Sequence, residues 1–282
     1  MTAYLRPRDL DEALAARAAH PDWMVLAGAT DLMVNANHRA APTGILDLWR
    51  LAPICFVRAA DGEIAIGAGA TWLEVERDAA VCTHLAPLAA AAREIGALQI
   101  QARATLGGNV GTSSPVGDSL PVLLALDAEL EVASVRGRRR VPYREWCTGY
   151  RTTRLAADEL IVAAHLPLPG PTTRTVWRKV GTRRAQSISK VMGAAAITLD
   201  GDVVIDARVA LGAIADRPVR IAAVEAAVRG QRLADAAHAA RAAVGPAIQP
   251  IDDVRSTASY RREVAENLVA RFFHGMMQRA DR

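Results

Sequence analysis

Two stretches of the sequence combine small and polar residues in patterns that could hold a phosphate group. The first, residues 26–32 (Leu-Ala-Gly-Ala-Thr-Asp-Leu), follows an apolar run that predicts a strand. Because most side chains of this stretch are small, successive backbone N–H groups could face an anion. An ordinary tight turn between a strand and a helix has the same composition, so both interpretations stay open.

The second stretch, residues 105–118, is polar and rich in glycine. Gly107 and Gly108 permit close approach of the backbone, and Asp118 can accept hydrogen bonds from sugar-type hydroxyls. Further hydroxyl and amide groups come from Asn109, Thr112, Ser113 and Ser114. This set suits a diphosphate joined to a polyol, while a plain surface loop remains the alternative.

The glycine spacing excludes two common nucleotide-binding motifs. No Gly-Lys-Ser or Gly-Lys-Thr follows either stretch, as a P-loop requires. Gly67-Ala68-Gly69 lacks the third glycine of the dinucleotide-binding motif. A Rossmann domain is therefore not predicted.

The cysteines and histidines form no pattern typical of a metal site or a nucleophile. No CxxC pair occurs, and no cysteine has a histidine at metal-ligand spacing. We therefore predict no metal site and no catalytic residue, and we interpret these side chains as inert thiols and as core or surface histidines. They are Cys55, Cys82, Cys147, His20, His38, His84, His165, His238 and His274.

Composition indicates an ordinary globular protein. Hydrophobic residues make up 51% of the chain and charged residues 23%, and the formal charge of +4 is scattered along the sequence. No apolar run approaches the roughly 18 residues that span a bilayer. We expect a cytoplasmic protein that binds neither nucleic acid nor a membrane.

Helices and strands must position the two polar stretches, and they alternate in the first half of the chain. The apolar periodicity and capping residues predict the following order. Helix 10–19 comes first, followed by strand 23–28, a turn and a helix beginning near Thr30. Next come strands 45–48 and 63–69, a capped helix from Thr71 and helix 87–95. The order ends with a loop over 105–118 and strands 129–135 and 160–166.

Residues 166–171 contain three prolines and a glycine, and we place a domain boundary there. Beyond it, strands 194–199 and 203–211 are joined around Asp200-Gly201, which predicts a hairpin. Alanine-rich helices follow, and the last, amphipathic helix covers residues 260–277. The second domain is predicted to be a small sheet covered by helices.

Five short motifs in one order extend over nearly the whole chain. They are residues 25–32 (Val-Leu-Ala-Gly-Ala-Thr-Asp-Leu), 105–110 (Thr-Leu-Gly-Gly-Asn-Val), 113–118 (Ser-Ser-Pro-Val-Gly-Asp), 179–191 and 253–262. In this order and spacing the chain resembles the FAD-binding subunit of the xanthine dehydrogenase and carbon monoxide dehydrogenase family of molybdenum hydroxylases.

The resemblance implies an α+β fold. A two-lobed FAD-binding domain of the vanillyl-alcohol-oxidase (PCMH) type would cover residues 1–168, with lobes of about 1–55 and 56–168. A small α/β sandwich, the flavoprotein C-terminal domain of this family, would cover residues 172–278.

The resemblance also implies the residues that hold FAD. Residues 26–33 and the turn 107–109 would cradle the pyrophosphate through backbone N–H groups, and Lys179 would be a cation near the ring. A solvated strand lysine is the equal alternative for Lys179. The implied set is Leu26, Ala27, Gly28, Ala29, Thr30, Asp31, Leu32, Met33, Ile95, Thr105, Gly107, Gly108, Asn109, Thr112, Ser114, Asp118, Ile161 and Lys179.

By the same resemblance, the chain would transfer electrons within a heterotrimer. It would receive them from a small subunit with two-iron two-sulfur clusters, which serves a large molybdenum-cofactor subunit, and pass them to NAD⁺ or another acceptor. Two alternatives remain: a stand-alone FAD-dependent reductase or oxidase of the same fold, and a scaffold subunit without a cofactor.

Overall fold

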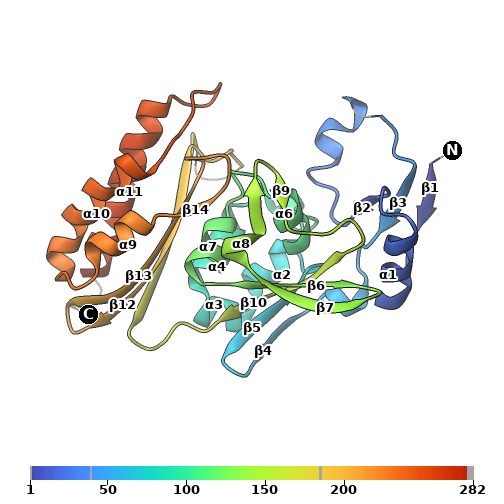
Figure 1. Cartoon of the computed structure of the whole chain (residues 1–282), viewed down its shortest axis with the longest axis horizontal. Helices are drawn as coiled ribbons and strands as arrows, with labels where there is room; N and C mark the ends of the chain where they lie inside the picture. Colours follow the sequence, from blue (N-terminus) through green and yellow to red (C-terminus); the bar gives the residue numbers. More distant parts are fainter. Residues whose placement is uncertain (1, 39, 184–185, 278–282) are drawn as a thin grey trace.

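The computed structural model describes residues 2–38, 40–183 and 186–277. Residue 278, the end of the predicted second domain, and residues 184–185 of the fourth motif lie outside them. Figure 1 shows the chain arranged in sequence order along its longest axis, with the N-terminal part at one end and the last helices at the other.

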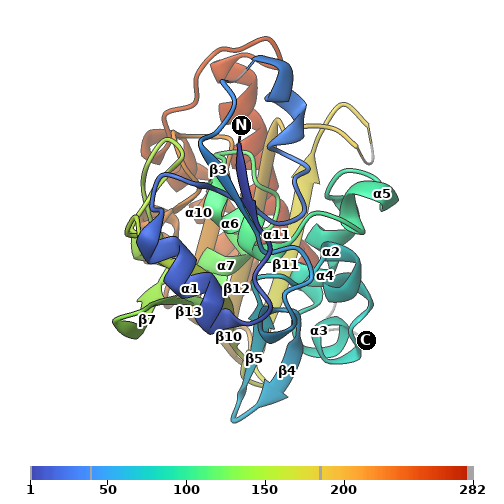
Figure 2. The same ribbon diagram turned by 90° about the vertical axis from the view of Figure 1, so that its right-hand side faces the viewer.

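The N-terminal part is a small parallel sheet with one helix. Strands β1 (Ala3–Leu5), β3 (Gly44–Asp47) and β2 (Met24–Leu26) are neighbours in that order, and they lie nearest the viewer together with α1 (Leu10–Ala19) in Figure 2. The Asp9 side chain accepts the Glu12 N–H at 2.8 Å and begins α1 where predicted.

The prediction of a helix beginning near Thr30 is wrong. Ala29 has a φ of +62°, and the chain continues through a turn into the short 3₁₀ helix η1 (Met33–His38). The Asp31 carboxylate contacts Arg151 instead of capping a helix. A residue in the left-handed region redirects the chain, so the small residues after β2 form an open loop.

The middle of the molecule is a five-stranded antiparallel sheet. Its neighbours in order are β4 (Val57–Ala60), β5 (Glu63–Gly67), β10 (Leu160–Pro167), β6 (Glu129–Ser134) and β7 (Gly137–Pro142). The short helix η2 (Ala52–Ile54) leads from β3 into this sheet. Short elements connect its strands: α2 (Trp72–Arg77), α3 (Ala79–His84), α4 (Ala86–Glu94), α5 (Leu98–Gln101), α6 (Leu106–Thr112), α7 (Leu120–Ala125), α8 (Tyr143–Trp146), β8 (Cys147–Gly149) and β9 (Thr152–Thr153). The capped helix predicted from Thr71 is confirmed, and its cap is a capping box between Thr71 and Glu74.

One face of this sheet lies in the main core, and the opposite face combines polar residues with apolar residues of β6 and β10 that pack against the N-terminal part. Ala164 and Leu166 of β10 belong to the main core, while His165 between them lies on the opposite face. The His165 ring nitrogens contact carboxylates of Glu63 at 2.7 Å and Glu131 at 2.9 Å. His165 is thus a core histidine, one of the two environments that the sequence predicts, and it forms cross-strand contacts.

Helix α6 occupies part of the stretch that the sequence predicts to be a loop, and that prediction is wrong. Thr105 caps α6 by accepting the Gly108 N–H at 3.1 Å. The buried indole of Trp146 donates to the Val110 carbonyl at 3.2 Å. These tertiary and capping bonds stabilise a helix whose glycines disfavour it by about 1 kcal/mol each.

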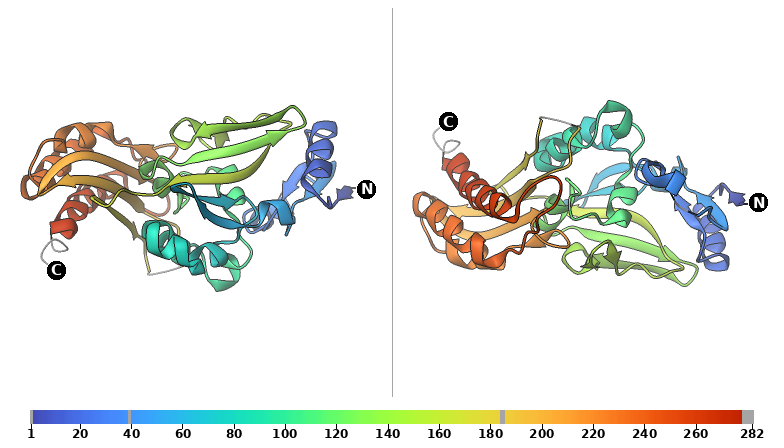
Figure 3. Two further views of the ribbon diagram at one scale, coloured as in Figure 1. Left: turned by 90° about the horizontal axis from the view of Figure 1, so that it is seen from below. Right: turned by 90° about the horizontal axis from the view of Figure 1, so that it is seen from above.

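The C-terminal part is a four-stranded sheet with helices on one face. Figure 3 shows the helices beside the sheet, and the predicted hairpin around Asp200-Gly201 is confirmed. The elements are β11 (Thr173–Val180), β12 (Val191–Asp200), β13 (Val203–Gly212), β14 (Val219–Arg220), α9 (Ala222–Val228), α10 (Leu233–Ala247) and α11 (Ala258–Met277).

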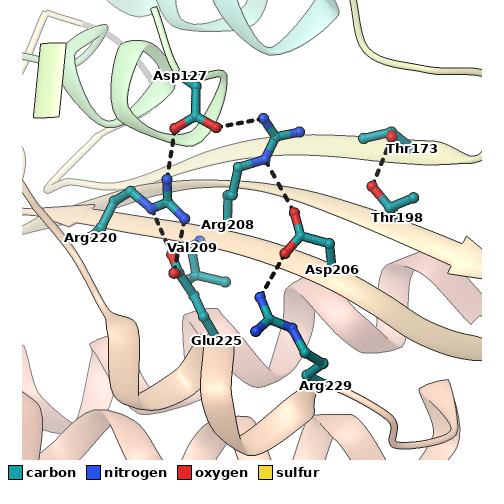
Figure 4. A network of polar contacts seen from close by, with 9 residues as sticks. All are labelled: Asp127, Thr173, Thr198, Asp206, Arg208, Val209, Arg220, Glu225 and Arg229. Carbon is teal, nitrogen blue, oxygen red and sulfur yellow. Dashed lines mark hydrogen bonds and ion pairs between the residues drawn. The ribbon is translucent and has the colours of Figure 1, made fainter. Parts of the chain in front are cut away.

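The other face of this sheet packs on the middle part of the molecule. Trp177, Ala194 and Ala210 belong to the same core cluster as α4 and α7. Figure 4 shows a polar rim to this contact, in which Asp127 accepts from Arg208 at 2.8 Å and Arg220 at 2.7 Å. Continuous apolar packing plus this ion-pair network fixes the two parts against each other.

None of the helices in the described ranges is long and apolar enough to cross a membrane.

Candidate cofactor-binding site

A cavity of about 850 Å³ lies where all three parts of the molecule meet. Its walls come from the loop after β2, from α6 and the segment that follows it, and from residues 186–188 between β11 and β12. This volume is in the range of sites that hold cofactors. All of the implied cofactor-binding residues line the cavity except Leu26, Met33 and Lys179.

The loop formed by residues 27–32, hereafter the amide loop, presents backbone donors without acceptors. None of its N–H groups donates a hydrogen bond to a described residue. All of these residues except Asp31 are buried or half-buried. Because buried N–H groups are nearly always paired, the loop is suited to an anionic ligand in the cavity.

Gly28 allows the amide loop to lie against the chain that precedes α6. A Cβ at this position would be 1.9 Å from the Arg103 carbonyl oxygen. The Arg103 guanidinium in turn lies 3.8 Å from the centre of the Trp49 ring. The glycine is therefore required for a close approach of two backbones rather than for an unusual φ.

The resemblance implies that the backbone N–H groups of residues 107–109 bind the pyrophosphate, but in this structure they already donate hydrogen bonds within the chain. Gly107 N–H donates to the Ala68 carbonyl at 2.8 Å, and Asn109 N–H donates to the Thr105 carbonyl at 3.0 Å. Position 107 has no room for a side chain, since a Cβ on Gly107 would lie 2.7 Å from the Cβ of Ala68. The backbone cradle in this structure is thus the amide loop, with α6 as its neighbour.

Gly108 supplies space instead of a donor. A Cβ on Gly108 would have only the Thr105 hydroxyl oxygen, at 3.1 Å, within 4 Å among described atoms, although Gly108 lines the cavity. Asn109 is held by its side chain, whose oxygen accepts from Ser119 at 2.7 Å. The cavity wall at Gly108 is therefore open to a ligand.

Asp118 and Lys179 form a buried pair that joins the two domains. The Lys179 ammonium lies 2.6 Å from one Asp118 oxygen and Ser189 donates to the other at 2.5 Å. The Lys179 side chain is 2% exposed and does not line the cavity. Burial raises the pKa of the Asp118 carboxyl above its ordinary value, although Lys179 and Ser189 oppose this shift. Lys179 is therefore not the solvated lysine of the alternative interpretation. In this structure its ammonium is also not a free cation facing the cavity.

The cavity has apolar as well as polar walls. Ile95, which is 9% exposed, and Ile161 line it as the resemblance implies, together with Ile100 and Ile188. Toward the N-terminal part the walls include Trp23, Val25, Leu48, Ile54 and Leu160. Such walls can accommodate flat ring systems.

The sequence did not reveal three polar residues in the walls. Arg17 on α1, Arg151 between β8 and β9, and Glu159 before β10 all line the cavity. Glu159 is 5% exposed and paired with Arg139 at 2.7 Å. No motif marks these residues, because only the tertiary fold brings them to the cavity.

The residues present fit a flavin adenine dinucleotide. Amides that donate to no described residue and the missing side chain at Gly108 suit the diphosphate, and the apolar walls suit the two ring systems.

Two family models together match almost the whole chain. Residues 1–169 match the FAD binding domain in molybdopterin dehydrogenase, and residues 177–276 match the CO dehydrogenase flavoprotein C-terminal domain. The chain belongs to this family. It is therefore an FAD-binding subunit of a molybdenum hydroxylase-type oxidoreductase, with the FAD-binding domain first and the flavoprotein C-terminal domain after it.

Relatives support the family over most of the chain. The glyceraldehyde dehydrogenase medium chain of Sulfolobus acidocaldarius is 31% identical over 274 residues and covers 96% of both chains. The xanthine dehydrogenase FAD-binding subunit of Escherichia coli O157:H7 is 34% identical, covering 77% of this chain and 76% of the relative. Carbon monoxide dehydrogenase from Hydrogenophaga pseudoflava superposes with a TM-score of 0.91 at 27% identity, covering 96% of this chain and 95% of that one.

Replacing Gly28 tests the close approach of the amide loop. Gly28→Ala places a methyl group against the Arg103 carbonyl, so we expect a loss of about 1–3 kcal/mol in the free energy of unfolding of the flavin-free chain. Gly111→Ala is the matched control in the same cavity, because its Cβ would meet Ile161 at an ordinary 3.6 Å. Equal stability of both variants in urea unfolding would refute the role of Gly28.

Removing the charge of Asp118 tests the pair between the domains. Asp118→Asn leaves the Lys179 ammonium buried without a counter-charge, so we expect a loss of about 3 kcal/mol in the free energy of unfolding. The double variant Asp118→Asn/Lys179→Met should recover most of this loss. A double variant as unstable as the sum of its single changes would contradict the pairing.

Proposed function

We propose that this FAD-binding subunit carries electrons from the iron–sulfur clusters of a small partner subunit to NAD⁺ or another acceptor. The observation that carries the proposal is a dinucleotide-sized cavity whose amide loop has no internal acceptors, in a chain of this family. When bound, FAD accepts electrons singly or in pairs, which suits a station between one-electron and two-electron carriers.

The residues of the chain bind and position the cofactor in this proposal. The amide loop holds the diphosphate, the opening at Gly108 leaves room for it, and Ile95 and Ile161 exclude water from the ring. Asp118 stays oriented by Lys179 and Ser189, with its remaining acceptor capacity toward ribityl hydroxyls. In this account the chain contributes orientation and electrostatics, and the substrate is transformed elsewhere.

We place this chain with a large molybdenum-cofactor subunit and a small iron–sulfur subunit in a cytoplasmic heterotrimer. Support comes from relatives named as medium subunits, among them the nicotine 6-hydroxylase medium subunit of Paenarthrobacter nicotinovorans, 29% identical over 272 residues. The carbon monoxide dehydrogenase medium chain of Hydrogenophaga pseudoflava is a second such relative, 26% identical over 271 residues. The partners would supply the substrate-binding site and the clusters.

Flavin release tests the cofactor assignment. We expect the purified full-length chain, after incubation with FAD and gel filtration, to release FAD in near-stoichiometric amount on acid precipitation. Gly108→Leu fills the open wall and should retain much less FAD at unchanged thermal stability, whereas Gly170→Ala, outside the cavity, should retain as much as the native chain. A native chain that retains no FAD would refute the assignment.

Electron delivery separates the proposed subunit from a stand-alone flavoenzyme. The FAD-loaded chain alone should not oxidise purines, N-heterocycles or aldehydes, and its flavin should be reduced by these substrates only in the complete complex. The complex is obtained by purifying the tagged chain from its native host. Rapid flavin reduction by such a substrate in the isolated chain would instead favour a reductase or oxidase with its own active site.

A further inference from the structure

Arg151 occupies the tip of a small hairpin that reaches the cavity. Its φ is +52°, and it lies between β8 and β9 and lines the cavity wall. The base of the hairpin is fixed, because Arg154 N–H donates to the Trp146 carbonyl at 3.0 Å and the Trp146 indole is bonded to α6. The guanidinium is therefore presented to the cavity from an anchored support.

The Arg151 guanidinium lies beside the amide loop. It is 3.5 Å from the carboxylate of Asp31, a member of that loop. The two side chains are 38% and 48% exposed, and ion pairs of this kind are weak and easily exchanged for another anion. A guanidinium can hold a phosphate with two parallel N–H donors.

Several other cations near the described cavity walls have contacts within the chain. Lys179 is buried against Asp118, and Arg139 is paired with Glu159. Arg17 also lines the cavity and donates to the Trp23 carbonyl at 3.0 Å, while its buried Nε has no partner among the described residues. A ligand with two phosphate charges on the amide loop would have the Arg151 guanidinium within reach, because Arg151 lines the cavity and contacts a member of that loop.

We propose that Arg151 binds the diphosphate of the dinucleotide opposite the amide loop and closes the site by joining the N-terminal and middle parts across it. This inference rests on the proposed flavin site and adds a residue to it. Asp31 holds the guanidinium in place before the cofactor enters and gives it up to the diphosphate. The carboxylate is then a competitor of the cofactor for Arg151, while the Asp31 backbone N–H remains in the amide loop.

The competition predicts opposite effects for the two partners. Arg151→Gln should weaken FAD binding about tenfold or more, because a charge-assisted hydrogen bond is lost. Asp31→Asn removes the competitor but keeps the backbone amide, so FAD binding should be unchanged or tighter. If the ion pair only held the two parts together, both substitutions would weaken FAD binding.

The experiment titrates the full-length flavin-free chain and its variants with FAD and, separately, with riboflavin, which has no phosphate, and follows flavin fluorescence. Arg154→Gln is the matched control, since Arg154 is three residues away, pairs with Glu145 and does not line the cavity. Thermal melting of each flavin-free variant checks folding. The loss in Arg151→Gln should concern FAD alone, with riboflavin affinity within twofold of the native chain.

Three results would overturn the assignment of Arg151. They are FAD affinity in Arg151→Gln equal to that of Arg154→Gln, equal losses for FAD and riboflavin, and a loss in Asp31→Asn that matches the loss in Arg151→Gln. Failure of the native chain to bind FAD at all would be a different result, because it refutes the proposed flavin site and the role of Arg151 with it.

Discussion

The close approach of the amide loop to residues 103–104 is the constraint on which the site depends. It is possible only because Gly28 has no side chain, and it brings next to α6 a run of backbone donors for which no described residue is an acceptor. The left-handed Ala29 then turns the chain away before a helix can use these donors. An anion site built from backbone needs no conspicuous side chain, which explains why small residues dominate this loop.

The second domain contributes to the same site through a buried pair rather than through a catalytic group. Asp118 on the cavity wall is held by Lys179 and Ser189 from the C-terminal sheet, and the Trp177 indole donates to the Asp118 carbonyl at 3.0 Å. The apolar contact of α7 with this sheet makes the arrangement rigid. The position of a cavity residue therefore depends on how the two domains pack.

Local chemistry predicted much of the fold, and tertiary contacts explain what it missed. Helix 10–19, the capped helix from Thr71 and the hairpin at Asp200 follow from caps, periodicity and turn residues. Helix α6 was missed because its glycines argue against a helix, while its stability comes from Thr105 and from Trp146 far along the chain. The short motifs and the resemblance identified the residues gathered at the cavity, but the occupied amides of 107–109 and the presence of Arg151 depend on neighbours distant in sequence.

Hydrogen–deuterium exchange of the full-length chain with and without FAD tests the central claim most directly. Without FAD, amides of residues 27–32 should exchange rapidly because they have no acceptor, whereas those of 107–109 should already be protected. Saturating FAD should protect residues 27–32 strongly and change 107–109 little. FAD binding that leaves the exchange of residues 27–32 unaltered would contradict the account.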